Sequence, residues 1–233
     1  MPSQIRVAIL DDHQSIVDGY TYRLNTAPEI QVVCSAYYGE HLEPMLADHV
    51  VDVLLLDLHV PTSPENHNPF PFLHIIPRLL QKYPDLNLLV ISMLNQRTLI
   101  EALVEAGVNG YIFKGDQTSI QQLAKIVSIV ANGGVYFSQD AKMKIRRKTH
   151  HRKDVTLTAR QLEVLSLCAA YPNSTTEELA RRLGIASSTI RNLLSRAYLR
   201  LEVRTRAAAI AELLRLGLIA APAKVRKAKR SNS

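Results

Sequence analysis

Two kinds of hydrophobic pattern divide the chain near residue 137. In the first half, short apolar runs typical of strands buried on both faces alternate with segments whose apolar residues recur every three or four positions. The strand-like runs are Arg6–Leu10, Gln31–Tyr37, Val50–Leu58, Leu86–Ser92 and Gly110–Phe113, and the helix-like segments include Ser15–Asn25, Thr98–Ala106 and Ser119–Ala131. This alternation predicts an α/β domain with a five-stranded parallel sheet and helices on both faces.

The second half contains no strand pattern after about residue 140. Thr158 with Gln161 and Ser174 with Glu177 have the capping-box spacing that begins a helix, and Gly184 is placed to end one. Two further helices are expected over Ser188–Leu201 and Arg206–Leu216. The second half is therefore predicted to be a small all-helical domain.

Basic segments without a hydrophobic face flank this helical domain. Lys142–Lys153 is polar and basic, and Lys224–Ser233 has the same character, which predicts a linker and a disordered tail. The expected organisation is an α/β domain over 1–137, a linker over 138–154, a helical domain over 155–220 and a tail over 221–233.

Composition narrows the class of protein. A hydrophobic content of 47% supports a buried core and excludes a collagen-like or wholly disordered chain. Cys34 and Cys168 match no metal-ligand or redox spacing, so both are expected to be buried thiols. The segment MPSQIRVAIL lacks the features of a secretory signal, and the longest apolar runs are too short to cross a bilayer. These features predict a soluble, cytoplasmic protein with no membrane association.

Charge is distributed unequally between the two halves. Residues 1–135 carry 7 Lys/Arg and 14 Asp/Glu, whereas residues 136–233 carry 21 Lys/Arg and 7 Asp/Glu. A basic domain suits a polyanionic partner such as DNA, because binding the phosphates releases their counterions. The sequence thus predicts two domains with different partners.

Polar residues follow successive strands of the predicted sheet. The positions are Asp11, Asp12, Asp57, Ser92 and Lys114. In a parallel sheet these strand ends share the carboxyl edge, where open sheets bind ligands. Carboxylates gathered there repel one another unless a hard cation such as Mg²⁺ lies between them. One carboxylate could attack a phosphoryl group, with lysine and serine stabilising the transferred oxygens.

These residues lie in motifs that resemble the receiver domain of two-component response regulators. The motifs are ILDDH at 9–13, LLLDLHVP at 54–61, VISM at 90–93 and GYIFK at 110–114, and the resemblance covers residues 4–135. It implies a flavodoxin-like sheet, phosphorylation of Asp57 by a cognate histidine kinase, and Mg²⁺ bound by Asp11 (through water), Asp12, Asp57 and the main-chain carbonyl of His59. It also implies that Ser92 is the switch hydroxyl, Tyr111 the rotating aromatic and Lys114 the phosphate-binding lysine.

Two departures from the receiver pattern concern the surroundings of this site. Gly115 follows Lys114 where the family usually has Pro or Asp, which suggests a looser loop. The proline-rich stretch Pro61–Pro77 is about six residues longer than expected. It is predicted to be an unusual loop close to Asp57, and a tolerated surface insertion explains it equally well.

Residues 155–219 resemble the helix-turn-helix effector domain of LuxR/NarL/FixJ-type regulators. The matching segments are LTARQLEVLSL at 157–167, EELARRL at 177–183 and STIRNLLSRAYLRLEV at 188–203. The resemblance implies a four-helix domain whose third helix enters the major groove of promoter DNA. The expected DNA-binding residues are Thr189, Arg191, Asn192, Ser195, Arg196 and Arg200.

The effector segment also departs from its family. Leu193 replaces the usual His, Glu202 the usual Gly and Glu177 the usual Lys, and the loop Ala170–Thr176 is about two residues longer. These changes leave the fold in place, but the target base sequence cannot be carried over from the family.

The last predicted helix has more apolar surface than a small core requires. Its apolar residues are Ala207, Ile210, Leu213 and Leu214. Pairing of this helix with its copy would place two recognition helices about one DNA turn apart, although packing within the domain accounts for part of the pattern. We expect a homodimer when the protein is phosphorylated. Before phosphorylation, the acidic receiver is expected to attract the basic effector and cover one DNA-binding face.

The favoured function is a phosphorylation-controlled transcription factor, with RNA polymerase as a further possible partner. A Mg²⁺-dependent aspartyl-phosphate phosphatase usually has a second carboxylate two residues after its nucleophile, where this chain has His59. Enzymatic activity is therefore expected only as slow autodephosphorylation. A small-molecule sensor would lack the carboxylates, and a phosphorylation-independent regulator would not need Asp57, Asp12 and Lys114.

Overall fold

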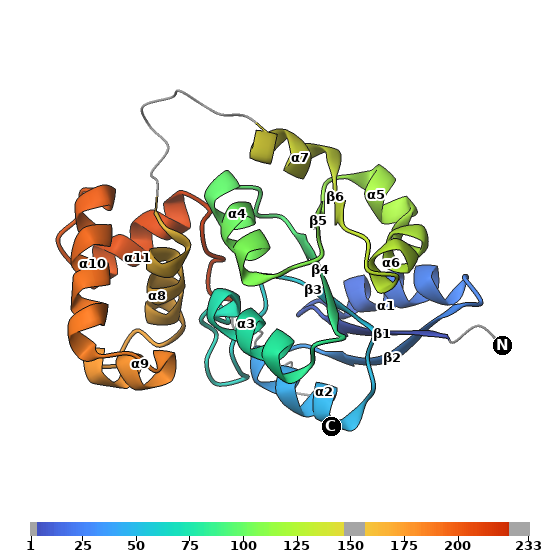
Figure 1. Cartoon of the computed structure of the whole chain (residues 1–233), viewed down its shortest axis with the longest axis horizontal. Coiled ribbons are helices and arrows are strands. Elements are labelled where there is room, and N and C mark those ends of the chain that lie inside the picture. Colours follow the sequence, from blue (N-terminus) through green and yellow to red (C-terminus); the bar gives the residue numbers. More distant parts are fainter. Residues whose placement is uncertain (1–3, 147–156, 224–233) are drawn as a thin grey trace, which may run out of the picture.

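The first half forms an α/β domain around one parallel sheet. The computed structural model describes residues 4–146 and 157–223 (Figure 1). The sheet has the strand order β2-β1-β3-β4-β5-β6, from β1 (Ile5–Leu10), β2 (Ile30–Ala36), β3 (Val53–Leu56), β4 (Asn87–Ser92), β5 (Gly110–Phe113) and β6 (Tyr136–Phe137). The α/β prediction is confirmed, but five strands were one too few. The sixth strand is only two residues long, which is too short to produce a hydrophobic pattern.

Helices cover both faces of this sheet, as expected. Alternate residues of β1 enter different cores: Ala8 and Leu10 pack with one set of helices, and Val7 and Ile9 with the other. The first set comprises α2 (Leu42–Asp48), α3 (Phe72–Lys82) and α4 (Arg97–Ala106), with the short 3₁₀ turn η1 (Gly39–His41) before α2. The second set comprises α1 (Gln14–Asn25) and α6 (Leu123–Ala131), and α5 (Gln117–Gln121) precedes α6. The expected helix Ser119–Ala131 is thus two helices separated at Gln122.

A helix occupies the start of the predicted linker. Helix α7 (Gln139–Arg146) packs against α4, β5 and β6. Ala141 is buried, and Ile145, one turn later, packs against the receiver core. These two apolar side chains tie an otherwise basic stretch to the α/β domain, so the expectation of a linker beginning at residue 138 is wrong. The rest of the expected linker, and the tail from residue 224, lie outside the described residues.

The proline-rich stretch is a loop only as far as Pro71. Pro77 lies inside α3, where burial of Ile76 and Leu79 outweighs the missing main-chain donor of proline. The loop 61–71 folds back on itself, because Phe70 N–H donates to the Val60 carbonyl. Its Phe70 ring packs on Gly39, where a Cβ atom would lie 2.1 Å from the ring. The loop is therefore an ordered part of the domain.

The second half is a four-helix domain. Its helices are α8 (Ala159–Ala170), α9 (Thr176–Leu183), α10 (Ser187–Leu201) and α11 (Arg206–Arg215). The capping box of Thr158 and Gln161 is confirmed. The box of α9 lies one residue later than predicted, on Thr175 and Glu178. Gly184 ends α9 in the left-handed conformation (φ 63°), as expected.

The helical domain contacts the α/β domain through α8 and through the segment after α11. Helix α8 packs against α3 and α4, and α10 is the outermost helix (Figure 1). The expected covering of the DNA-binding face is not observed, since the candidate DNA-binding residues of α10 are exposed and α10 lies on the side of α8 away from the α/β domain (Figure 1). Among the described residues, no helix is long and apolar enough to cross a membrane.

The two cysteines differ in burial. Cys168 is buried as expected, whereas Cys34 on β2 is only half-buried. In both cases burial raises the pKa of the thiol to about 11. Both thiols are therefore poorly nucleophilic at neutral pH.

Candidate functional site

The carboxyl edge of the sheet brings the predicted acidic residues together with a lysine. Asp11 follows β1, Asp57 follows β3 and Lys114 follows β5. The ammonium nitrogen Nζ of Lys114 lies 2.7 Å from Asp11 Oδ2 and 2.8 Å from Asp57 Oδ2. Both carboxylates are almost completely buried. One cation therefore bridges two buried anions, as the shared carboxyl edge of a parallel sheet predicts.

The electrostatics of the site favour the charged forms of Asp57 and Lys114. Burial alone would raise the pKa of Asp57, but the nearby His59 imidazole and Lys114 ammonium outweigh it and lower that pKa. For Lys114, the two carboxylates outweigh the effect of burial and raise its pKa. Asp11 has a raised pKa, because burial dominates over its bond to Lys114. Asp57 is thus held as a carboxylate, which is the nucleophilic form.

One oxygen of the site has no hydrogen-bond partner. Asp57 Oδ1 is buried and makes no hydrogen bond within the described residues, and His59 Nδ1 lies 3.7 Å from it. Asp11, Asp12 and His13 offer ligand atoms within 4.8 Å of one another, so they could hold a metal ion. Together with Asp57, these residues fit a hard cation.

His13 is a site residue that the sequence analysis did not identify. Its Nδ1 lies 2.7 Å from Asp12 Oδ1, and its main-chain N–H donates to Asp11 Oδ1. The sequence indicates His13 only through its place in the motif ILDDH, where it directly follows the two aspartates.

Ser92 and Tyr111 both contact the same residue beyond β4. The main-chain N–H of Leu94 donates to Ser92 Oγ at 3.2 Å, and the Tyr111 hydroxyl donates to the Leu94 carbonyl. Both Ser92 and Tyr111 are fully buried. A change at Ser92 can therefore reach the segment between β4 and α4 through Leu94.

The segment after Lys114 is a tight turn. Asp116 N–H donates to the Phe113 carbonyl, and the Asp116 carboxylate caps α5 by accepting from Ser119 N–H. A Cβ at Gly115 would lie 2.4 Å from the Phe113 ring, so a larger residue here would require that ring to move. The expectation of a looser loop at Gly115 is therefore wrong.

Helix α10 presents a polar face to the surroundings. Ile190, Leu194, Ala197 and Leu201 are buried, as the periodicity predicted. The six candidate DNA-binding residues are exposed, namely Thr189, Arg191, Asn192, Ser195, Arg196 and Arg200. Leu193, in place of the usual His, is half-buried against the core.

Two arginines of α10 have specific partners, and Glu202 ends this helix. Arg200 Nη1 donates to Gln161 Oε1 at 2.8 Å, which ties the end of α10 to the start of α8. Arg191 Nη1 lies 3.7 Å from Glu177 Oε1 on α9. Glu202 has a φ of 57° and ends α10 in the left-handed conformation, which explains why the family usually has Gly at this position.

The candidate dimerisation residues on α11 differ in how far they are buried. Leu213 is completely buried in the core of its own domain. Ala207 is exposed, and Ile210 and Leu214 are half-buried. Packing within the domain thus accounts for Leu213, and only the other three offer surface to a second copy.

Comparison with known families and proteins agrees with this geometry. Residues 7–127 match the model of the response regulator receiver domain, and residues 155–202 match that of sigma-70, region 4. The chain is 26% identical over 238 residues to the transcriptional regulatory protein DegU of Brevibacillus brevis, covering 93% of this chain and 96% of DegU. It is 25% identical over 209 residues to the response regulator protein VraR of Staphylococcus aureus, covering 88% and 94%.

Solved structures show the same fold. RcsB of Salmonella enterica serovar Typhimurium, bound to promoter rprA in the presence of the phosphomimetic BeF₃⁻, matches with a TM-score of 0.66 and 20% identity. That match covers 91% of this chain and 98% of RcsB. The receiver model matches more than half of the chain, and the helical domain follows it in the order seen in these relatives. The chain therefore belongs to the response regulator receiver family, as a two-component response regulator of the NarL/FixJ type.

Proposed function

We propose that the chain is a DNA-binding transcriptional regulator controlled by phosphorylation of Asp57. The single observation that carries this proposal is the buried Asp57 carboxylate, whose Oδ2 is bonded to Lys114 and whose Oδ1 makes no hydrogen bond within the described residues. A carboxylate with one oxygen free of hydrogen bonds can act as a nucleophile. It lies in the same chain as an exposed helix-turn-helix.

The proposed chemistry is transfer of a phosphoryl group from a cognate histidine kinase. A carboxylate oxygen of Asp57 attacks phosphorus, the P–N bond to the kinase imidazole breaks, and the leaving nitrogen keeps the electron pair and is protonated from solvent. Lys114 moves from the carboxylate to the new phosphoryl oxygens, and the Ser92 hydroxyl donates to another. Slow hydrolysis of the protein's own acyl phosphate is the only enzymatic activity that we propose.

A divalent cation completes this site, and Mg²⁺ is the proposed ion. Asp12, Asp57 and the His59 carbonyl would bind it directly, with Asp11 acting through water. Bound Mg²⁺ neutralises charge on the transferred phosphoryl group. Two observations support this assignment: the ligand atoms gathered at Asp11, Asp12 and His13, and the Asp57 oxygen that makes no hydrogen bond within the described residues.

Promoter DNA is the proposed partner of α10. Thr189, Arg191, Asn192 and Ser195 are proposed to face the major groove, and Arg196 and Arg200 to contact phosphates. The excess of Lys and Arg in residues 136–233 supports this role. Homodimerisation on phosphorylation, through the exposed part of α11, and contact with RNA polymerase are further proposals, as is a cytoplasmic location.

Phosphorylation of Asp57 should raise affinity for a duplex with two half-sites. We expect wild-type protein with Mg²⁺ and acetyl phosphate to gain one acid-labile phosphoryl group and to sediment as a dimer. Asp57→Asn should abolish both, because an amide is a poor nucleophile. Phosphate content, sedimentation velocity and duplex binding measure the three effects.

Each departure from this result has a distinct meaning. Full labelling of the Asn variant would reject Asp57 as the acceptor. Labelling of wild-type protein without a change in mass or DNA affinity would favour regulation by protein contacts alone. Tight dimers before addition of acetyl phosphate would contradict only the proposed control of dimerisation.

Two arginines of α10 should have different effects on DNA binding. Arg191→Ala should cost roughly 1–3 kcal/mol at the specific site if the guanidinium reads a base edge. Arg200, held at the end of α10 by Gln161, is proposed to contact phosphate, so Arg200→Ala should weaken all duplexes alike and flatten the salt dependence. Fluorescence anisotropy with cognate and random duplexes over a salt series separates the two roles. Equal losses on both duplexes for both variants would contradict the division.

A further inference from the structure

Leu199 is an exposed leucine on a face of α10 that is otherwise polar. It is 79% exposed, the largest value for any large apolar residue in the part of the chain that the structure describes. The seven other exposed residues of α10 are all polar, namely Ser188, Thr189, Arg191, Asn192, Ser195, Arg196 and Arg200. A leucine at this place therefore differs in chemistry from every exposed neighbour on its helix.

The position of Leu199 is the midline of the exposed face, not its border. Ser188, Asn192, Ser195 and Leu199 are separated by four, three and four positions, so their side chains form one line along the helix. The buried residues of α10 follow the opposite side, namely Ile190, Leu194, Ala197 and Leu201. Arg200, the next residue, extends the cationic character of the face to the end of the helix. Any surface that lies along the exposed line of α10 therefore meets Leu199.

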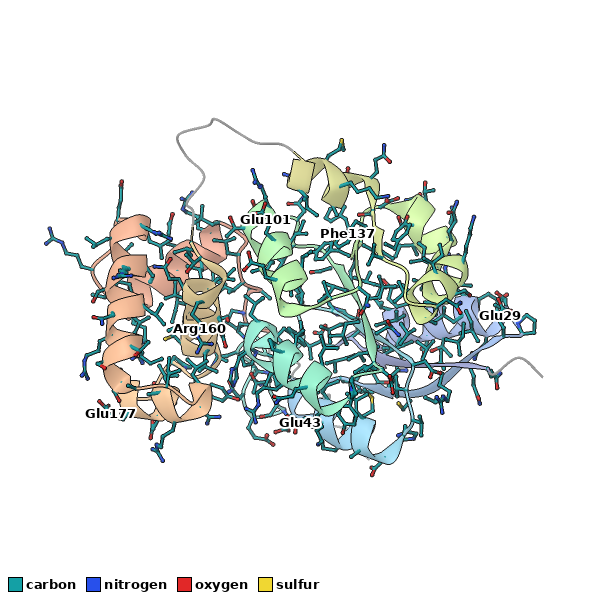
Figure 2. The ribbon with its side chains drawn as sticks, in the orientation of Figure 1. Glu29, Glu43, Glu101, Phe137, Arg160 and Glu177 are labelled. Carbon is teal, nitrogen blue, oxygen red and sulfur yellow. The ribbon has the colours of Figure 1, made fainter. Side chains whose placement is uncertain are left out.

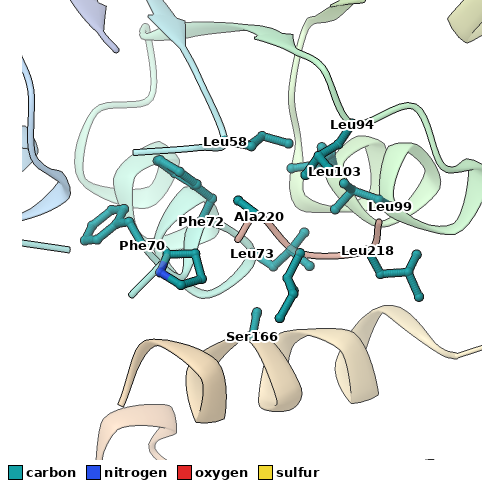
Figure 3. A pocket seen from close by; sticks show the side chains of 12 residues that line it. Leu58, Phe70, Phe72, Leu73, Leu94, Leu99, Leu103, Ser166, Leu218 and Ala220 are labelled. Atoms are coloured by element: carbon teal, nitrogen blue, oxygen red, sulfur yellow. The ribbon is translucent and has the colours of Figure 1, made fainter. Parts of the chain in front are cut away.

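Leu199 has no packing role that accounts for it. Single exposed apolar residues are common on protein surfaces, and most of them need no explanation. The apolar pocket between the two domains is lined by receiver residues, by Ser166 of α8 and by residues 218–220, and none of the described residues that line it belongs to α10 (Figure 3). At the end of α10, Leu201 fills the core of the helical domain. Leu199 is thus left for a partner of α10.

The chemistry of DNA gives a leucine at this place one matching group. An α-helix with its side chains is about 10–12 Å across, so it enters the major groove, about 12 Å wide, and not the minor groove, about 6 Å wide. In the major groove the base edges present hydrogen-bond donors and acceptors, which leucine cannot use, and the 5-methyl group of thymine, which is apolar. Contact with that methyl group removes apolar surface of both partners from water.

We propose that Leu199 contacts the 5-methyl group of a thymine in the DNA target and is a specificity-determining residue of this protein. The inference rests on the proposed function, in which α10 lies in the major groove. Leu199 is four residues after Ser195, or about 6 Å farther along the helix axis. The thymine that it contacts therefore lies toward the C-terminal end of α10, beyond the bases that face Asn192 and Ser195.

Thymine and deoxyuridine differ only in the methyl group, so matched duplexes isolate the contact. Full-length wild-type protein, with Mg²⁺ and acetyl phosphate, first selects its preferred duplex from a random-sequence library. Each thymine of that duplex is then replaced in turn by deoxyuridine, and fluorescence anisotropy gives Kd for wild type and for Leu199→Ala. At one thymine of a half-site, loss of the methyl group should weaken wild-type binding about fourfold, the effect of one buried methyl group. The same replacement should leave the Kd of Leu199→Ala unchanged.

Two further variants serve as controls. Leu199→Ile keeps an apolar side chain of the same size, so it should retain the dependence on the methyl group. Val50→Ala truncates another exposed apolar residue, 66% exposed and located on the receiver, and should behave as wild type on every duplex.

The behaviour of wild type separates failure of this inference from failure of the proposed function. If wild type selects a preferred duplex but no thymine shows a methyl effect that Leu199→Ala lacks, the inference is overturned and the function stands. A loss of affinity by Leu199→Ala that is equal with thymine and deoxyuridine also overturns it, because such a loss indicates a contact with the sugar-phosphate backbone or with a second copy of the chain. If wild type binds no duplex preferentially, the proposed function fails, and the inference fails with it.

Discussion

Replacing Lys114 by alanine should lower the free energy of unfolding by about 3–5 kcal/mol when no divalent cation is present. Lys114 Nζ is within 2.8 Å of both the Asp11 and Asp57 carboxylates, which are 2% and 3% exposed. Removing the ammonium leaves two buried like charges without their cation. Urea denaturation at neutral pH in the presence of a chelator measures the loss.

Mg²⁺ should restore much of that loss, because a bound cation can take over the neutralising role of the ammonium. Wild type should be stabilised less by the same concentration of Mg²⁺. Lys125→Ala is the matched control, since Lys125 is an exposed lysine on α6. Equal losses for Lys114→Ala with and without Mg²⁺ would contradict a cation site beside these carboxylates.

The pH dependence of the Lys114 effect has a definite sign. In wild type the pKa of Asp57 is lowered, so its contribution to stability is present above the unfolded-state pKa and is lost as pH falls. In the variant, acid protonates the unpaired carboxylates and relieves their repulsion. The stability difference between wild type and Lys114→Ala should therefore shrink as pH falls below about 4.

The core of this site was predictable because it follows from topology. Successive strand ends of a parallel sheet share one edge, so Asp57 and Lys114 had to approach each other once the alternation of strands and helices was recognised. The buried face of α10 was also predictable, because the spacing of its apolar residues identifies that face without knowledge of distant contacts. The end of α9 was also predictable from local chemistry, because glycine readily adopts the positive φ that Gly184 has there.

Features that depend on long-range contacts were not predictable from the sequence. Helix α7 has the composition of a linker because it has few apolar side chains packed on the core, among them Ala141 and Ile145. The loop 61–71 makes hydrogen bonds to main-chain atoms, such as the bond from Asn66 to the Ala170 carbonyl. Every residue has a main-chain carbonyl, so the sequence does not reveal which one the loop contacts. His13 was not predicted for a different reason: its partner Asp12 is its neighbour in the sequence, but only the folded chain shows the imidazole turned toward that carboxylate.

Glu177→Lys should raise affinity for all DNA duplexes, by roughly tenfold at low salt, because it replaces a repelling charge by an attracting one beside the DNA-binding helix. Glu177 lies in the first turn of α9 and is exposed, far from the receiver (Figure 2). Its carboxylate is 3.7 Å from Arg191 Nη1, so it also competes with DNA for that guanidinium. The logarithm of the binding constant should fall more steeply with the logarithm of salt concentration, by the amount that about one to two additional phosphate contacts would give.

Glu43→Lys makes the same change of charge on α2 of the receiver and should leave DNA affinity nearly unchanged, since Glu43 is exposed far from α10 (Figure 2). Glu177→Gln then separates two roles for this carboxylate. If Glu177 only repels phosphates and restrains Arg191, the Gln variant should bind cognate and random duplexes more tightly by the same factor. If Glu177 instead accepts a hydrogen bond from a cytosine amino group, the Gln variant should lose affinity for the cognate duplex alone. A loss confined to the cognate duplex would contradict the electrostatic explanation and would make Glu177 and Arg191 neighbouring base-reading residues.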